Sequence, residues 1–255
     1  MKEEIVRRLK AIENSEKIKI LFAVESGSRA WGFASADSDY DVRFVYVRPK
    51  NEYLRLDRVR DVIELPLDSV FDINGWDLDK TLKLLYKSNA TLFEWLSSPM
   101  VYIQTDFMHE LKQIVNRYFS SKRVLYHYLN MAKGNYRESL RDDSVKAKKY
   151  FYVLRPILAC RWILANGTPP PMLFTELMTS QLDESIKQEV NMLLDIKMNF
   201  PEIHEIPRVD KINAYIENHL EKVRDEIDHL SEEQRNDWQE LNNLFINTVS
   251  AFDET

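Results

Sequence analysis

Hydrophobic and polar positions alternate in two short segments near the start of the chain and follow a helical period in most of the rest. The first helix is predicted for residues 2–14, whose apolar positions recur on one side: Ile5, Leu9 and Ile12. The stretch KIKILFAVES then alternates and is rich in branched and aromatic residues, so it predicts a strand that ends at Ser26. A short helical turn is expected after the Gly27–Ser28 pair.

The segment YDVRFVYV predicts a second strand over residues 40–47. Apolar side chains share one face of that strand: Tyr40, Val42, Phe44 and Tyr46. Charged side chains share the other face: Asp39, Asp41 and Arg43. Further strand segments are expected in DVIELPL and SVFDIN, and LDKTLKLLYKS predicts the start of a helix.

From about residue 77 onward the pattern is helical nearly to the end of the chain. One long segment has an apolar stripe typical of a core-facing helix: Ala147, Phe151, Leu154, Leu158 and Trp162. Gly167 and the following TPPP predict the end of that helix. The expected helices are NATLFEWLSS, DFMHELKQIVNRYF with Thr105–Asp106 as its cap, SKRVLYHYLNMAKGNYRESL, SVKAKKYFYVLRPILACRWILANG, and residues 181–199, 207–230 and 232–249.

These patterns together predict an α+β fold. A small mixed β-sheet with helices is expected in residues 1–115, and an all-helical domain is expected in residues 116–255. No internal repeat and no low-complexity linker separates the two parts.

Composition excludes several classes of protein. The hydrophobic content of 44% and charged content of 30% are ordinary for a globular chain. No apolar run reaches eighteen residues, and the first residues lack an apolar signal core, so neither a membrane span nor an export signal is predicted. The single cysteine, Cys160, excludes an internal disulfide and fits a reducing cytoplasm, where it is expected to be a buried small hydrophobe.

Charge is distributed unevenly along the chain. The net charge of −6 argues against a general nucleic-acid coat. Residues 121–161, however, hold ten Lys and Arg against three acids, a net charge of +7 that leaves −13 for the remainder. A basic island in an acidic chain indicates a local anionic ligand, although a solvated helical face has the same pattern.

Asp39 and Asp41 project from the same face of one predicted strand, with Cβ atoms roughly 6–7 Å apart by strand geometry. Ionised carboxylates at that spacing repel each other unless a cation lies between them. Mg²⁺ meets this need, because it takes hard oxygen ligands and leaves positions open for phosphate and water, and two-metal sites use such acids for phosphoryl transfer. A third acid is needed from a neighbouring strand, and Asp72 is the best placed, with Asp77 as the fallback.

The Gly-Ser pair that precedes these acids suits a triphosphate. Gly27 has no Cβ, so phosphate oxygens approach its backbone closely. Backbone N–H groups at a helix start bind anions, and the Ser28 hydroxyl adds a donor. Either feature alone is more often a plain turn or a solvated strand end, but their combination on strand, turn, helix and strand favours a nucleoside triphosphate site.

The stretch GSRAWGFASADSDYDVRF resembles the Gly-Ser…Asp-x-Asp signature of the DNA polymerase beta-type nucleotidyltransferase superfamily. Within it, DINGWDLDKTLKLLYKSNATLFEWLSSPMVY and KKYFYVLRPILACRWIL are similar to predicted bacterial nucleotidyltransferases associated with RNA repair. The resemblance implies that residues 1–115 form the catalytic domain. It implies Asp39 and Asp41 as the first metal-binding pair and Asp72 as the third, activating acid. The nucleotide-binding residues expected within the signature are Gly27, Ser28, Arg29 and Ser38.

Basic helical residues offer further candidate ligands. Lys149 and Arg155 fit the electrostatic demand of a triphosphate or a leaving pyrophosphate, and Pro156 is expected to kink their helix. A second basic row follows at one-turn intervals: Lys133, Arg137 and Arg141. Ordinary surface charge over a buried stripe is the alternative for both groups.

The predicted function is Mg²⁺-dependent transfer of a nucleoside monophosphate from a triphosphate to a hydroxyl, with release of pyrophosphate and an RNA end as the favoured acceptor. One alternative is an enzyme that transfers AMP to a protein hydroxyl. Another is a catalytically silent nucleotide-binding protein. The charged C-terminal helices are expected to be either a solvated face or a surface for a protein partner.

Overall fold

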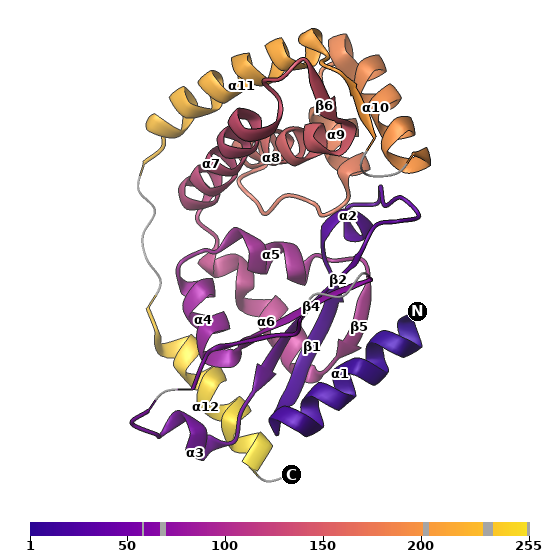
Figure 1. The fold of residues 1–255 in the computed structure, drawn as a ribbon. Coiled ribbons are helices and arrows are strands. Elements are labelled where there is room, and N and C mark those ends of the chain that lie inside the picture. The colour runs from indigo at the N-terminus through magenta and orange to yellow at the C-terminus, as the bar shows by residue number, and fades with distance from the viewer. Residues whose placement is uncertain (58, 67–69, 201–203, 232–236, 254–255) are drawn as a thin grey trace. The chain divides into compact units, whose positions relative to one another are not determined.

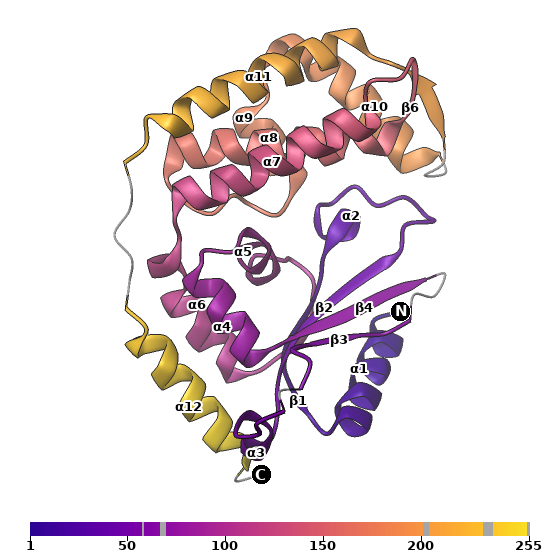
Figure 2. The ribbon, with the colours of Figure 1, turned by 60° about the vertical axis from the view of Figure 1, so that its left-hand side comes forward.

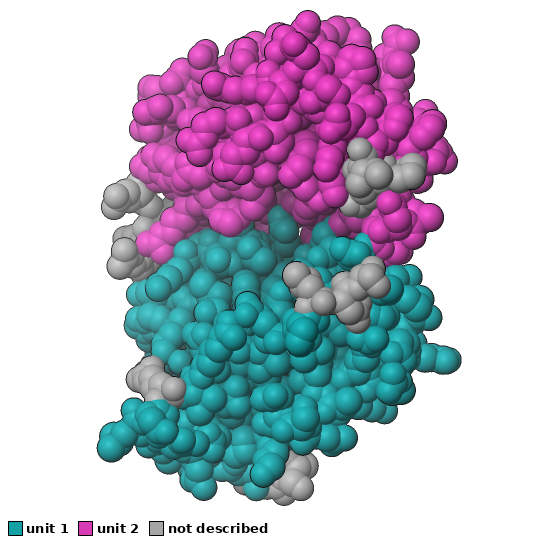
Figure 3. Space-filling view, in the orientation of Figure 1, with its two compact units in different colours: residues 1–27, 39–118, 235–255 teal, residues 28–38, 119–234 magenta. Residues whose placement is uncertain are grey.

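The protein is described by a computed structural model, and the residues described are 1–57, 59–66, 70–200, 204–231 and 237–253. The chain divides into two compact units (Figure 3). Unit 1 comprises Met1–Gly27, Asp39–Tyr118 and Arg235–Thr255. Unit 2 comprises Ser28–Ser38 and Phe119–Gln234.

Unit 1 is built on a five-stranded mixed sheet with strand order β3-β4-β2-β1-β5 (Figure 1). Neighbouring strands are antiparallel except β2 and β4, which are parallel. The strands are β1 Lys19–Glu25, β2 Tyr40–Val47, β3 Val62–Glu64, β4 Phe71–Asp77 and β5 Val101–Gln104.

Helix α1 (Lys2–Glu16) packs its apolar side on one face of this sheet. The predicted stripe of Ile5, Leu9 and Ile12 is buried there, in one cluster with the apolar face of β2. The alternation of β2 is therefore confirmed: Val42 and Phe44 point into this core, while Asp41 and Arg43 lie on the opposite face.

The opposite side of the sheet carries further helices of unit 1 (Figure 2). Asp77 caps α4 by accepting from the backbone N–H of Asp79, and Asn89 caps α5 in the same way through the N–H of Leu92. Thr105 precedes α6, but its hydroxyl donates to the carbonyl of Leu21. The elements are α2 Gly27–Ala30, which crosses into unit 2, α3 Lys50–Tyr53, α4 Leu78–Tyr86, α5 Ala90–Leu96, α6 Asp106–Ile114 and η1 Val115–Tyr118.

The last helix, α12 (Gln239–Asp253), belongs to unit 1 although it is far along the chain. The Tyr53 and Phe245 rings pack edge-on with centroids 5.1 Å apart. The Tyr86 and Trp238 rings stack at 3.7 Å. The chain therefore returns to its first unit after it has built the second.

Unit 2 is mainly helical and contains a short antiparallel pair of strands, β6 and β7. Helix α8 is its centre, because it is buried on most of its sides, more widely than the predicted stripe. It continues through Pro156 and ends at Gly167, which adopts the expected left-handed conformation (φ 65°). The elements are α7 Ser121–Ser139, β6 Ser144–Lys146, α8 Ala147–Asn166, α9 Phe174–Gln181, η2 Glu184–Ile186, α10 Lys187–Asn199, β7 Glu205–Pro207 and α11 Asp210–Asp228.

The segment 28–38 is part of unit 2, although it follows β1 directly in the chain. Its Phe33 ring packs against the rings of Phe151 and Phe174, with centroids 5.0 and 5.5 Å away. The backbone carbonyl of Trp31 accepts from the N–H of Phe174 at 2.9 Å. Aromatic packing and this hydrogen bond thus anchor the segment among the helices.

The predicted α+β fold class is confirmed, with a mixed sheet followed by a helical part. Three short strands were not predicted, since β5, β6 and β7 lie where a helical pattern was expected. The two units differ from the predicted domains over segments 28–38 and 235–255, and the second segment of unit 1 ends at Tyr118 rather than at residue 115. Residues 232–236 of the last predicted helix, and residues 67 and 69 of the predicted strands, lie outside the described part.

No helix in the described residues combines the length and the apolar character needed to cross a bilayer.

Candidate active site

Asp41 and Asp72 lie side by side on neighbouring parallel strands. The register of β2 and β4 aligns the Cα atom of Asp41 with that of Asp72. Each carboxylate belongs to a partly exposed side chain, 28% and 32% exposed respectively. The structure therefore brings the second acid of the Asp-x-Asp pair together with the acid predicted from SVFDIN.

The Arg43 guanidinium lies between these two carboxylates. Its Nη2 donates to Asp41 Oδ1 at 3.0 Å and to Asp72 Oδ2 at 2.6 Å. Its Nη1 donates to the backbone carbonyl of Asp72 at 2.7 Å. The side chain is only 14% exposed, so these charge-assisted bonds are partly shielded from water. A cation of the chain itself therefore separates acids that would otherwise repel each other.

Glu25 fixes the backbone of this site from the neighbouring strand. It is the last residue of β1 and is fully buried. Its Oε1 accepts from the N–H of Asp41 at 2.8 Å, and its Oε2 accepts from the hydroxyl of Tyr102 on β5. Glu25 was not predicted as a site residue, although an acid that closes the apolar run LFAVE is a signal that could have found it.

Gly27 lies against the Asp41 carboxylate and has a left-handed backbone, with φ at 58°. A Cβ on this residue would stand 2.0 Å from Asp41 Oδ2 and 2.8 Å from its Cγ. The neighbouring Ser26 N–H donates to the carbonyl of Asp41 at 2.8 Å. Only glycine therefore allows the turn to approach the carboxylate this closely.

Asp39 is exposed and precedes β2 by one residue. The residue before it, Ser38, is held firmly within unit 2. Arg29 donates to the Ser38 carbonyl at 2.6 Å, and the Lys197 ammonium donates to the hydroxyls of Ser35 and Ser38 at 2.8 and 3.3 Å. Lys197 is 3% exposed. A buried cation thus holds the chain immediately upstream of Asp39, and no sequence pattern had indicated it.

Lys149 and Arg155 both belong to unit 2, together with Ser28 and Arg29. Lys149 is partly exposed, with its Nζ 5.4 Å from the centre of the Tyr152 ring. Arg155 is 1% exposed, and its guanidinium lies 4.7 Å from the centre of the Trp31 ring. The prediction that both residues contact phosphate remains a prediction, and the burial of Arg155 indicates a structural contribution to segment 28–38.

Magnesium suits the donors of this site in chemical terms. Asp41 and Asp72 offer hard carboxylate oxygens, and the close approach of Gly27 leaves backbone rather than a side chain beside Asp41. Within the described residues, no group of three or more acids, His or Cys is positioned to hold one ion. A metal at this pair would therefore take over the role of Arg43 and draw its remaining ligands from water, Asp39 or phosphate.

Asp77, the fallback third acid, serves a different purpose at the other end of β4. Its Oδ1 accepts from the Tyr53 hydroxyl at 3.0 Å and from the N–H of Asp79 at 2.9 Å, and its Oδ2 lies 3.3 Å from Arg48 Nε. Burial raises the pKa of Asp77 to about 6. The same buried setting raises the pKa of Tyr53. Asp77 is therefore the N-cap of α4, and it lies at the opposite end of β4 from Asp72, the residue that is aligned with Asp41.

Comparison of the sequence with known protein families identifies the family of this chain. Residues 1–247 match the family described as "RNA repair pathway DNA polymerase beta family", so the chain belongs to this family of polymerase beta-like nucleotidyltransferases. It is 47% identical over 251 residues to a Bacillus subtilis (strain 168) protein named "Uncharacterized protein YcgL", with 98% of this chain and 96% of that protein covered.

A search of solved structures found a nucleotidyltransferase-like protein from Exiguobacterium sibiricum 255-15, determined by crystallography at 1.90 Å resolution. The match covers 97% of this chain and 90% of that chain, at 12% sequence identity and a TM-score of 0.31.

Proposed function

We propose that this protein transfers a nucleoside monophosphate from a nucleoside triphosphate to a hydroxyl group, with an RNA end as acceptor. The observation that supports this most is the pairing of Asp41 with Asp72 on parallel strands, directly beside Gly27. Membership in the RNA repair pathway DNA polymerase beta family supports the reaction class.

In this proposal the acceptor hydroxyl oxygen attacks the α-phosphorus of the triphosphate. The bond between the α-phosphorus and the bridging oxygen breaks, and pyrophosphate leaves with the electron pair. The hydroxyl proton passes to the Asp72 carboxylate, which orients the acceptor. Atoms and charges balance without a further reactant.

Asp39, Asp41 and Asp72 would hold two Mg²⁺ ions. When bound, these ions would stabilise negative charge on the attacking and leaving oxygens. Gly27 and Ser28 would bind the β- and γ-phosphates through backbone N–H groups and a hydroxyl. Arg29, Ser38 and Lys149 are proposed to complete the nucleotide site, and the Arg29 guanidinium donates to the Ser38 carbonyl at 2.6 Å. Arg155, which is buried beside Trp31, would contribute by holding segment 28–38 in place.

The experiment is a transfer assay with each of four α-labelled nucleoside triphosphates, offered in turn a single-stranded RNA and a protein extract. Asp41→Asn and Asp72→Asn should each lower transfer to RNA by at least about a hundredfold, since each removes a charged oxygen ligand of the proposed magnesium ions. Asp57→Asn is the matched control, because Asp57 is 79% exposed and pairs with Arg55 at the surface.

The destination of the label decides between the functions. Label in RNA that depends on both acids supports the proposal. Label in protein instead would replace it with AMP transfer to a protein hydroxyl. Nucleotide binding without any transfer would replace it with a silent nucleotide-binding protein.

A further inference from the structure

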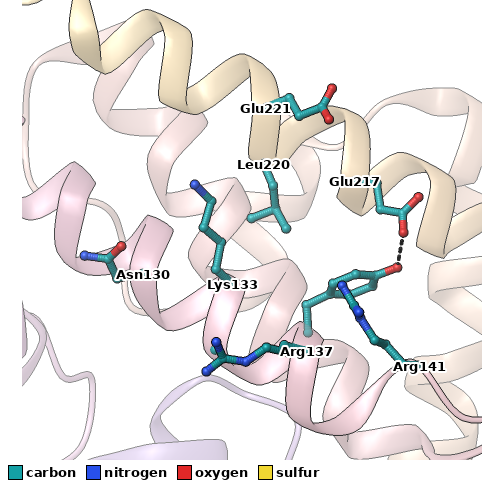
Figure 4. A pocket seen from close by; sticks show the side chains of 9 residues that line it. Asn130, Lys133, Arg137, Arg141, Glu217, Leu220 and Glu221 are labelled. Atoms are coloured by element: carbon teal, nitrogen blue, oxygen red, sulfur yellow. Dashed lines mark hydrogen bonds between the residues drawn. The ribbon is translucent and has the colours of Figure 1, made fainter.

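A groove of about 640 Å³ runs between α7 and α11 within unit 2 (Figure 4). One side is basic and is formed by Lys133 and Arg137 on α7 and by Arg141 just past its end. The other side is acidic and is formed by Glu217 and Glu221 on α11. We call it the α7–α11 groove.

The three cations of this groove were noted in the sequence as a row at one-turn intervals. Lys133 and Arg137 keep that spacing on α7, while Arg141 lies beyond the helix, which ends at Ser139. Four residues of helix advance by about 6 Å. This advance is comparable to the separation of consecutive phosphates along an extended single strand, so the row suits a repeating anion better than one isolated phosphate.

The charges of the basic side are largely unneutralised among the described residues. There, Lys133 has no hydrogen bond or ion pair. The Arg141 guanidinium has no ion pair either and lies 6.0 Å from the centre of the Tyr136 ring. Arg137 pairs only with the exposed Glu138, at 3.9 Å. An exposed pair at that distance contributes little, so the three cations keep their attraction for an external anion.

The acidic side is built to accept hydrogen bonds. The Tyr136 hydroxyl donates to Glu217 Oε1 at 2.5 Å. Burial is the main reason that the pKa of Tyr136 is raised to about 12, so this hydroxyl remains a donor at neutral pH. Within the described residues, neither Glu217 nor Glu221 pairs with a cation of the opposite side. A ligand of this groove must therefore present anions to α7 and hydrogen-bond donors to α11.

We propose that the α7–α11 groove binds a single-stranded segment of RNA. The phosphates contact Lys133, Arg137 and Arg141, and ribose 2′-hydroxyls and base amino groups donate to Glu217 and Glu221. RNA carries both kinds of group in alternation, whereas DNA lacks the 2′-hydroxyl. The proposal rests on the proposed function, in which RNA is the acceptor, and it adds a place on the helical unit that binds this acceptor.

The test measures RNA binding by fluorescence anisotropy, with no nucleotide and no metal added. The probe is a labelled single-stranded RNA of about 12 nucleotides, within the usual range of such sites. In the triple variant Lys133→Gln, Arg137→Gln, Arg141→Gln we expect a loss of affinity of at least about tenfold. We also expect the slope of log K against log salt concentration to shrink by about 2, since each lost phosphate contact accounts for about 0.7.

A matched control removes three other lysines of unit 2: Lys187, Lys211 and Lys222, each to Gln. This control changes the net charge equally, so an unchanged affinity and slope would show that the position of the charges matters. Melting temperatures of both triple variants establish that they are folded. If the groove variant is folded and binds RNA like the unchanged protein, the proposal is overturned.

The acidic side is tested with Glu217→Gln and Glu221→Gln together. The unchanged protein should bind RNA more tightly than DNA of the same base sequence, and the double variant should bind both more tightly but with a smaller preference for RNA. Equal binding of RNA and DNA by the unchanged protein would overturn the assignment to RNA. So would displacement of RNA by polyglutamate at equal charge concentration, because the groove would then be a site for acidic peptides.

The assay keeps this proposal separate from the proposed function. Absence of nucleotide transfer combined with groove-dependent RNA binding would defeat only the transfer. If the triple variant transfers nucleotide to RNA as well as the unchanged protein does, only the proposal for the groove is overturned.

Discussion

The guanidinium of Arg43 and the carboxylate of Asp72 form a 2.6 Å ion pair across neighbouring parallel strands, and the same nitrogen also reaches Asp41 at 3.0 Å. One positive charge thus holds together two acids that repel each other. In the absence of metal, Arg43 is the counter-ion of the candidate active site.

Replacing this counter-ion should make the fold more dependent on magnesium. Arg43→Gln leaves Asp41 and Asp72 facing each other, which should lower the free energy of unfolding by about 1–2 kcal/mol without metal. A bound ion then stabilises the folded state, so MgCl₂ should raise the melting temperature more in the variant than in the unchanged protein. Arg55→Gln is the control, because Arg55 pairs with exposed acids. Equal responses to MgCl₂ would contradict the assignment of Asp41 and Asp72 as metal ligands.

Gly27→Ala should destabilise the protein by more than the backbone strain of a left-handed alanine, because the new side chain collides with Asp41. The new Cβ would stand 2.0 Å from Asp41 Oδ2, so the carboxylate must move. Gly167→Ala provides a matched comparison, since Gly167 has a similar φ of 65° and no atom within 4 Å of an added Cβ. The control should cost roughly 1–2 kcal/mol of stability for the left-handed conformation alone. Gly27→Ala should cost at least about 1 kcal/mol more in urea unfolding. An equal loss of stability in the two variants would show that the Asp41 carboxylate can move away from the new Cβ at no cost.

Lys197→Met should loosen the segment that leads into Asp39. The buried ammonium donates to Ser35 and Ser38, and its loss removes the tie between α10 and segment 28–38. Hydrogen–deuterium exchange should therefore become faster in peptides covering residues 28–41. Lys187→Met, on the first turn of the same helix and paired with Glu184 at the surface, should leave that exchange unchanged. Restoration of slow exchange by Lys197→Arg would support a positioning role. Unaltered exchange in Lys197→Met would refute it.

Asp77 should make the protein less stable as pH rises from 4 to 6. Its pKa is raised from the ordinary 3.8 to about 6 by burial, so the folded state holds this proton over a range in which the unfolded state has lost it. The contribution is complete below pH 4 and is lost as pH rises through 6, and a shift of this size corresponds to at most about 3 kcal/mol. Burial sets this direction and outweighs the hydrogen bonds from the Asp79 N–H and the Tyr53 hydroxyl and the charge of Arg48, which all lower the pKa of Asp77.

Urea unfolding across this pH range checks the effect. Asp77→Asn keeps a capping side chain but has no proton to lose, so its stability should vary less with pH. Asp106→Asn, an exposed change in the first turn of α6, should retain the slope of the unchanged protein. Parallel curves for Asp77→Asn and the unchanged protein would contradict the expectation.

Local patterns were sufficient to predict the elements on which the site is built. The alternation in YDVRFVYV predicted the bounds of β2 and placed Arg43 on the same face as Asp41. The further step, that Arg43 itself separates the acids, was missed because the register of β2 with β4 is not visible in either segment alone. Asp72 was chosen as the third acid because it lies in a predicted strand; its alignment with Asp41 fits that choice, and its role stays a prediction.

Features that depend on distant partners could not be predicted in this way. Glu25 acquires its role from Tyr102, which lies 77 positions away. Strands of three residues such as β6 and β7 are too short for a periodic signal and form only by pairing with each other. The sequence around Phe33 has no periodic pattern, and the position of this ring depends on its packing against Phe151 of α8 and Phe174 of α9. In each case, the energy that selects the arrangement comes from tertiary contacts.

The assignment of segment 28–38 to unit 2 determines how the molecule can be dissected. A fragment that stops at Tyr118 would keep Asp41 and Asp72 but would strip Trp31 and Phe33 of their helical neighbours and lose α12 as well. Such a fragment would expose these aromatic side chains next to Gly27 and would tend to aggregate. Truncation after Tyr118 is therefore not expected to give a well-folded fragment that carries Asp41 and Asp72, because segment 28–38 needs the helices of unit 2.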